Sequence, residues 1–182
     1  MPTRTYRPIH VATLASGMDL VLPLHEIVGD KPGPTLGISA GIHGEEAVGV
    51  EVVYRFMQSL DPSALRGRLL VLPVANPFSY AAISRHTPID GGNLNRLFPG
   101  HRDGQLTEQL AFVMSEQFLR RIDNYVDLHA GGETACHASA ALTTTTIIFL
   151  VRVIIAPRWP GSRPCRHRCP VPRRRQCGGS AP

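Results

Sequence analysis

His43 and Glu46 stand in the segment AGIHGEE, residues 40–46, where an apolar run ends and a helical period begins. Imidazole nitrogen and carboxylate oxygen are ordinary zinc ligands. Because only three residues separate them, both side chains would reach into one crevice from an opening helical turn. An isolated H-x-x-E is a weak signal, since Glu46 also fits the solvated first turn of a helix. The pair therefore needs a partner elsewhere in the chain.

A catalytic zinc takes three protein ligands and leaves one position open, so a third donor is required. His129 is the candidate, because it directly follows the short strand-like segment Asn124–Leu128. Asp127 lies two residues earlier, on the same face of an extended segment, and would accept a hydrogen bond from the imidazole N–H that the metal leaves free. The pattern predicts one zinc ion per chain, and a surface or core histidine is the alternative.

The ligand-bearing segments are expected at neighbouring strand ends of an α/β sheet. Residues 35–40 are typical of a buried strand, and residues 68–74 of a second one, with a helix between them. Such a βαβ unit has parallel strands, and ligands bind beyond their carboxyl ends. The apolar face of the helix is predicted to consist of Ala47, Val50, Tyr54, Met57 and Leu60.

A hairpin, a turn cluster, a long loop and a second helix are also predicted. Residues 9–15 and 20–28 predict an antiparallel hairpin, and residues 29–34 a turn cluster. Residues 76–105 lack a clear period and predict a long functional loop. Thr107 is predicted to cap a helix. The apolar face of that helix is assigned to Leu110, Val113 or Met114, Phe118 and Ile122.

Charge divides the chain at about residue 137. Residues 1–137 hold 11 Lys+Arg and all 14 Asp+Glu, a net of −3, whereas residues 138–182 hold eight Arg and no acid. We expect 1–137 to be the N-terminal part of a catalytic domain and 138–182 to be an aberrant Arg/Pro-rich tail, largely disordered. The abrupt change in composition favours a frameshifted segment.

Composition also bears on location and partners. No run approaches the roughly 20 apolar residues of a membrane span, and the N-terminus lacks a signal-peptide core. We therefore expect a cytoplasmic protein with no membrane partner. Nucleic acid is an unfavoured partner, because the tail lacks interleaved aromatic residues beyond Trp159. A second metal site in the tail matches no common zinc spacing; its residues would be Cys165, His167, Cys169 and Cys177.

Four ordered motifs resemble the succinylglutamate desuccinylase/aspartoacylase family, a branch of the zinc carboxypeptidase fold. They are G-I-H-G-E-E, the N-P at residues 76–77, the R-x-T-P-x-D-G-x-N-L-N-R-x-F-P-G of residues 85–100, and the V-D-L-H of residues 126–129. The likeness covers about residues 10–137. It implies a mixed, largely parallel sheet flanked by helices and incomplete at the C-terminus.

The resemblance implies a zinc-dependent deacylase that cleaves the amide bond of small N-acyl amino acids, with peptides and small esters left open as substrates. It makes the zinc ligands His43, Glu46 and His129. It assigns binding of the substrate carboxylate to Asn95 and Arg96. It gives Arg85 the polarisation of the scissile carbonyl.

The chain departs from the family in one respect. Family members carry a glutamate on a later strand as general base, and no acidic residue follows Glu133 here. Neither Glu45 nor Glu133 has a reason to face the metal, so the base is expected to be missing from this chain. Two alternatives follow. One is a catalytically inactive zinc-binding fragment, and the other is a nucleic-acid-binding protein that acts through its Arg-rich tail.

Overall fold

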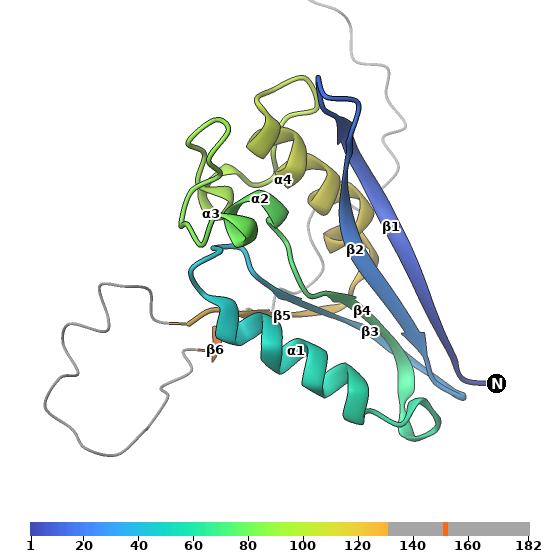
Figure 1. The fold of residues 1–182 in the computed structure, drawn as a ribbon. Helices are drawn as coiled ribbons and strands as arrows, with labels where there is room; N and C mark the ends of the chain where they lie inside the picture. Colours follow the sequence, from blue (N-terminus) through green and yellow to red (C-terminus); the bar gives the residue numbers. More distant parts are fainter. Residues whose placement is uncertain (131–150, 153–182) are drawn as a thin grey trace, which may run out of the picture.

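The computed structural model describes residues 1–130 and the two-residue strand Val151–Arg152 (Figure 1). The described part contains one six-stranded sheet with the order β1-β2-β4-β3-β5-β6. The central strand β3 runs parallel to β4 and β5, and the other neighbouring pairs are antiparallel. The strands are β1 Thr3–Thr13, β2 Asp19–Val28, β3 Lys31–Ala40, β4 Arg66–Leu72, β5 Asn124–Leu128 and β6 Val151–Arg152.

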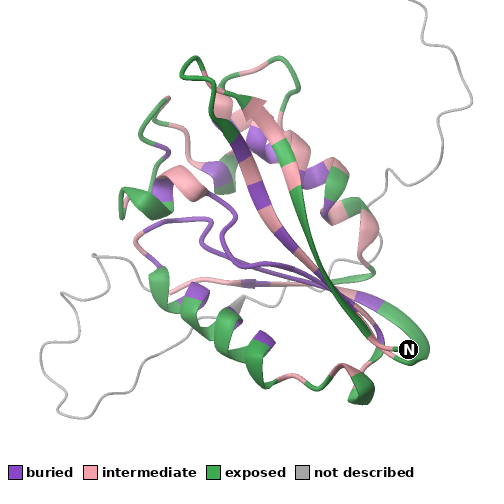
Figure 2. Cartoon of the chain, turned by 45° about the vertical axis from the view of Figure 1, so that its right-hand side comes forward, coloured by how far each residue is buried: buried purple, intermediate pink, exposed green. Residues whose placement is uncertain are grey.

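Helices cover both faces of this sheet. Helix α1 (Ala47–Ser59) packs on one face and α4 (Leu106–Gln117) on the other, while the short helices α2 (Pro77–Ala81) and α3 (Leu94–Leu97) lie between β4 and α4 in the chain. Each face has its own hydrophobic core. Figure 2 shows burial concentrated in the central strands and in the turn that follows β3. The mixed sheet flanked by helices that the sequence predicts is confirmed. The described sheet is not largely parallel, however, because three of its five strand pairs are antiparallel.

The hairpin and the βαβ unit are also confirmed, with changed boundaries. Strand β1 pairs with β2 from Thr3 onward, six residues earlier than predicted. The predicted turn cluster at residues 29–34 is wrong beyond Asp30, because Lys31 already pairs with Arg66 of β4. Two 3-10 turns, Pro62–Ala64 and Leu119–Arg121, precede β4 and β5.

Helix α1 presents a slightly different face to the sheet than its period predicts. Its buried residues are Gly49, Val50, Val53 and Met57. Tyr54 was assigned to the buried face, but its side chain is 38% exposed. Val53, which the prediction omitted, is 1% exposed. The core therefore lies along the adjacent row of α1, and the Tyr54 ring borders the solvent.

The predicted long loop is partly helical, since it contains α2 and α3. The prediction that Thr107 caps α4 is wrong. The capping residue is Gln105, whose N–H donates to Glu108 Oε2 at 2.8 Å. Thr107 is instead fully buried, and its hydroxyl donates to Asp90 Oδ1 at 2.6 Å. Leu110, Met114 and Phe118 are buried as predicted. Asp90 thus ties the loop to the start of α4.

Some sequence-based predictions fall outside the described residues. These are the domain boundary at residue 137, the disorder and the frameshift of 138–182, and the cysteine-rich segment. Within that tail only Val151–Arg152 is described, as strand β6 paired with β5. No helix of the described part has the length and apolar character needed to cross a bilayer. The predicted cytoplasmic location stays a prediction.

Candidate metal centre

A sharp turn after β3 carries His43 and Glu46. Gly41 has a φ of +65°, a conformation that glycine adopts at little cost. A side chain on Gly44 would overlap the carbonyl of Ser79, so only glycine fits this approach to α2. Glu46 is the residue just before α1 and makes no capping hydrogen bond with its side chain. Its carboxylate is therefore free to contact the two histidines instead of capping the helix.

The three predicted ligands meet at the Glu46 carboxylate. His43 Nδ1 lies 2.9 Å from Glu46 Oε1, and His129 Nδ1 lies 2.8 Å from Glu46 Oε2. Ligand atoms of the three residues lie within 4.8 Å of one another. His43 is 1% and Glu46 is 4% exposed. Two imidazoles and one carboxylate that lie close together form a donor set that suits zinc.

The other nitrogen of each imidazole is also held in place. His129 Nε2 lies 2.7 Å from Asp127 Oδ2, and His43 Nε2 lies 3.2 Å from Asn93 Oδ1. Partners of this kind fix the ring orientation and leave the opposite nitrogen for a metal. Asn93 was missed by the sequence analysis, which gave no role to it. Asn93 directly precedes α3, and its side chain also accepts from the Asn95 N–H.

The electrostatics of the site follow from burial and hydrogen bonding. Burial opposes ionisation of Glu46, but hydrogen bonds from His129 and His43 outweigh it and lower the pKa of Glu46 to about 2. The hydrogen bond to Asp127, followed by that to Glu46, raises the pKa of His129 to about 10 despite its burial. Negative charge thus gathers around a protonated imidazole. A divalent cation would take the place of a proton beside Glu46, while Asp127 would keep its hydrogen bond with His129 Nε2.

Arg85 lies at the edge of the three ligands. Its Nη1 is 3.1 Å from Glu45 Oε1 and 3.5 Å from Glu46 Oε1, with the Arg85 side chain 45% exposed. Asn95 and Arg96 are exposed on α3. Within the described residues, neither side chain makes a hydrogen bond or ion pair with the three ligands. Of the predicted substrate-contacting residues, the fold brings only Arg85 to them.

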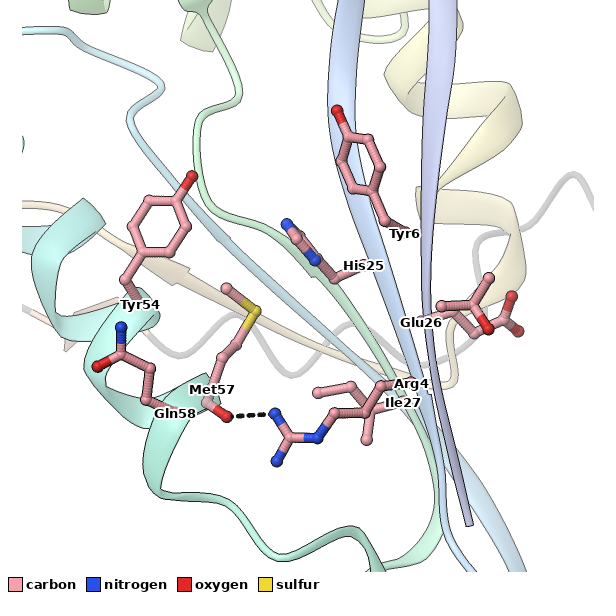
Figure 3. Close-up of a pocket in the computed structure, with 9 residues that line it drawn as sticks. Arg4, Tyr6, His25, Glu26, Ile27, Tyr54, Met57 and Gln58 are labelled. Carbon is pink, nitrogen blue, oxygen red and sulfur yellow. Dashed lines mark hydrogen bonds between the residues drawn. The ribbon is translucent and has the colours of Figure 1, made fainter. Parts of the chain in front are cut away.

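A separate hollow of about 370 Å³ lies between α1 and the β1–β2 hairpin. Figure 3 shows Tyr54 and Met57 on the helix side, with Tyr6 and His25 on the strand side. Arg4 spans this gap, and its Nη1 donates to the Met57 carbonyl at 2.6 Å. None of the three candidate ligands lines the hollow, so it is distinct from the metal centre.

The chain has counterparts among known proteins. The model of the succinylglutamate desuccinylase/aspartoacylase catalytic domain matches residues 32–146. The chain belongs to the succinylglutamate desuccinylase/aspartoacylase family. The matched range contains every residue of the candidate metal centre. This is a family of deacylating hydrolases, and the family resemblance drawn from the four motifs is confirmed.

Relatives of the family give the same assignment. N-alpha-acetyl-L-2,4-diaminobutyric acid deacetylase of Halomonas elongata is 37% identical over 102 residues, which are 56% of this chain and 30% of that protein. The structure of an aspartoacylase family protein from Mesorhizobium loti matches with a TM-score of 0.63 and 37% identity, over 71% of this chain and 41% of that one.

Two further solved structures extend the comparison. A product-bound ectoine utilization protein from Ruegeria pomeroyi gives a TM-score of 0.63 and 30% identity, over 71% of this chain and 40% of that one. The structure of a succinylglutamate desuccinylase/aspartoacylase from Rhodobacter sphaeroides matches with a TM-score of 0.66 and 26% identity, over 71% of this chain and 40% of that one. In each of these matches the chain spans less than half of the relative.

Proposed function

We propose that this chain carries the metal site of a zinc-dependent deacylase that cleaves the amide bond of small N-acyl amino acids, with one zinc per chain. The observation that supports it is the convergence of the ligand atoms of His43, Glu46 and His129, which lie within 4.8 Å of one another. These residues come from two separate strand ends, and both imidazoles turn Nδ1 toward the same carboxylate. A histidine placed only for packing has no need of this arrangement.

The substrate class is supported by the names of relatives. The Halomonas elongata protein is a deacetylase of an N-acetylated diamino acid. The family description names a desuccinylase and an aspartoacylase, which are likewise deacylases. We infer an N-acyl amino acid with a free carboxylate as the substrate, and we assign Asn95 and Arg96 to that carboxylate because guanidinium and amide groups match it well.

The chemistry divides between the metal and the residues around it. Bound zinc supplies Lewis-acid activation of an amide carbonyl and of water. His43, Glu46 and His129 hold the ion, while Asp127 and Asn93 keep the two imidazoles oriented. The Arg85 guanidinium, at the rim of the ligands, offsets negative charge that develops on the substrate carbonyl oxygen.

A general base is the component that the described residues do not offer. Glu45 is engaged by Arg85, and Asp127 accepts from both Ser39 and His129. Neither carboxylate is free to take a proton from water. This favours a second candidate function for the 182-residue chain, namely zinc binding without turnover. The deacylase proposal assigns the base to residues outside the described part or outside this chain.

Zinc content and turnover together test the proposal. The purified chain is loaded with zinc and assayed for release of free amine from N-acetyl and N-succinyl amino acids, with the zinc-free chain as control. Turnover that requires zinc supports the deacylase. If turnover is observed, the Arg96→Ala variant should have a higher KM with little change in kcat. Stoichiometric zinc without turnover favours the second candidate, and absence of zinc binding contradicts both.

A further inference from the structure

Two buried hydroxyl groups extend the metal centre into the sheet. Ser39 on β3 is fully buried, and its Oγ donates to Asp127 Oδ1 at 2.6 Å. The hydroxyl of Tyr125 on β5 lies 2.6 Å from the same Ser39 Oγ. Asp127 uses its other oxygen, Oδ2, to contact His129 Nε2. A continuous chain of hydrogen bonds therefore runs from Tyr125 through Ser39 and Asp127 to His129.

The direction of these hydrogen bonds follows from proton counting. A serine hydroxyl has one hydrogen, and here Asp127 takes it, so Ser39 accepts from Tyr125. Burial, followed by the nearby charge of Asp127, raises the pKa of Tyr125 well above its ordinary value, so the phenol stays protonated and donates. Both hydroxyls thus direct their hydrogen toward the carboxylate, an arrangement in which each bond strengthens the next.

The sheet register places these groups side by side. Ser39 is the direct partner of Asp127 in the parallel β3–β5 pair, and Gly37 is the partner of Tyr125. The absence of a side chain at Gly37 leaves room first for Ile122 and then for Phe118. The Tyr125 ring packs edge-on against that phenylalanine, with centroids 5.9 Å apart. The phenol is therefore fixed by packing before it reaches Ser39.

We propose that Ser39 and Tyr125 are positioning residues of the metal centre, which act through Asp127 to aim His129 Nδ1 at the metal. The proposal rests on the proposed zinc site. With Oδ1 of Asp127 occupied by Ser39, the carboxylate has one orientation, and Oδ2 is left for His129. Without that hydroxyl, Asp127 is free to rotate, and His129 loses its fixed direction.

The test measures zinc affinity of the full 182-residue chain by competition with a chelator. Replacing a direct partner of a metal-bound histidine costs about 10- to 100-fold in affinity, and residues one step further out should cost roughly 3- to 10-fold. Ser39→Ala and Tyr125→Phe should each weaken zinc binding by that smaller factor. Tyr125→Phe keeps the packing against Phe118, so it remains informative even if Ser39→Ala folds poorly.

Two matched controls separate this effect from general destabilisation. Ser115 is also buried, but its hydroxyl has no hydrogen-bond partner within the described residues. Tyr54 lies away from the centre, in the hollow beside α1. Ser115→Ala and Tyr54→Phe should bind zinc as the parent chain does. Unfolding midpoints of all metal-free variants show whether a loss of affinity merely follows a loss of stability.

A double-mutant cycle with Asp127→Asn decides the route of the effect. If Ser39 and Tyr125 act through Asp127, adding either substitution to Asp127→Asn causes no further loss of zinc affinity. Full additivity of the losses would overturn the proposal, as would parent-like affinity in both single variants. If the parent chain binds no zinc, the proposed function itself is contradicted. If the parent and both single variants bind zinc equally well, only the positioning proposal is contradicted.

Discussion

Glu46 Oε2 lies 2.8 Å from His129 Nδ1, although 83 residues separate the two positions in the chain. The contact exists because β3 and β5 are adjacent and parallel, so that the segments following them leave the sheet at the same edge. The His129 side chain keeps 18% of its surface exposed, whereas Glu46 is buried.

Arg85→Ala should tighten zinc binding by about two- to fivefold. The guanidinium lies 3.5 Å from Glu46 Oε1, where it competes with the metal for the carboxylate and repels a cation. Affinity is measured by chelator competition, with the exposed Arg96→Ala as control. The gain should shrink at high salt, because Arg85 is 45% exposed. Weaker zinc binding by Arg85→Ala would mean that the arginine supports the ligand set.

Asp90→Asn should lower the free energy of unfolding by about 1 kcal/mol near neutral pH. Asp90 accepts from the Thr107 hydroxyl at 2.6 Å and from the Thr107 and Gly92 N–H groups at 2.7 and 3.0 Å. Urea unfolding measures the loss. Asp103→Asn serves as control, because Asp103 is exposed and its carboxylate makes no hydrogen bond within the described residues.

The effect of Asp90 should also depend on pH. Burial opposes its ionisation, but the hydrogen bonds from Thr107 and Gly92 lower the pKa of Asp90 below its ordinary value of 3.8. The folded chain therefore keeps this carboxylate ionised where the unfolded chain begins to bind a proton. Its contribution is complete above the ordinary pKa and is lost as the pH falls through the lowered one. A difference between the parent and Asp90→Asn that stays constant down to about pH 2 would contradict this role.

Arg4→Ala should destabilise the fold by about 1 kcal/mol without changing zinc affinity. The guanidinium of Arg4 donates to the carbonyls of Met57 and Leu60 at the C-terminal end of α1. Thermal unfolding should show a midpoint lower by about 2–4 °C. Arg55→Ala is the matched control, since among the described residues Arg55 pairs only with Glu51, on the exposed side of the same helix. Equal effects of the two substitutions would show that the Arg4 contacts add nothing.

Much of the fold follows from the sequence because its signals are local. Apolar runs and a change of period identify the strands β3 and β4 and the helix between them, and chain connectivity makes those strands parallel. The adjacency of β5 and β3 then brings His129 to His43 and Glu46, as the pattern predicts. Local signals fail where a tertiary contact outweighs the local preference of a residue.

Two residues show that limit. Thr107 has the chemistry of a helix cap, but Asp90, 17 residues away, takes its hydroxyl. Tyr54 fits the helical period, but the sheet contacts the neighbouring row of α1 that includes Val53. In both cases a tertiary contact outweighs the local preference. Periodicity alone gives no information on such contacts.

The outer part of the metal centre was not predictable for a related reason. Ser39 reads as a polar exception in an apolar strand, and Tyr125 as an ordinary strand residue. Their role depends on the register that sets Ser39 opposite Asp127, which a single sequence does not define. Asn93 likewise reaches His43 only through the path of the loop between α2 and α3. The candidate ligands and the support Asp127 were thus predictable, whereas Asn93, Ser39 and Tyr125 were not.

The most direct test of the central claim is the zinc content of the purified 182-residue chain and its ligand variants. We predict about one zinc per chain, lost in His43→Ala and in His129→Ala. A variant with Cys165, Cys169 and Cys177 changed to serine should retain its zinc, since those residues are not assigned to the site. Stoichiometric zinc that persists in both histidine variants, or that disappears with the cysteines alone, would contradict a metal centre at His43, Glu46 and His129.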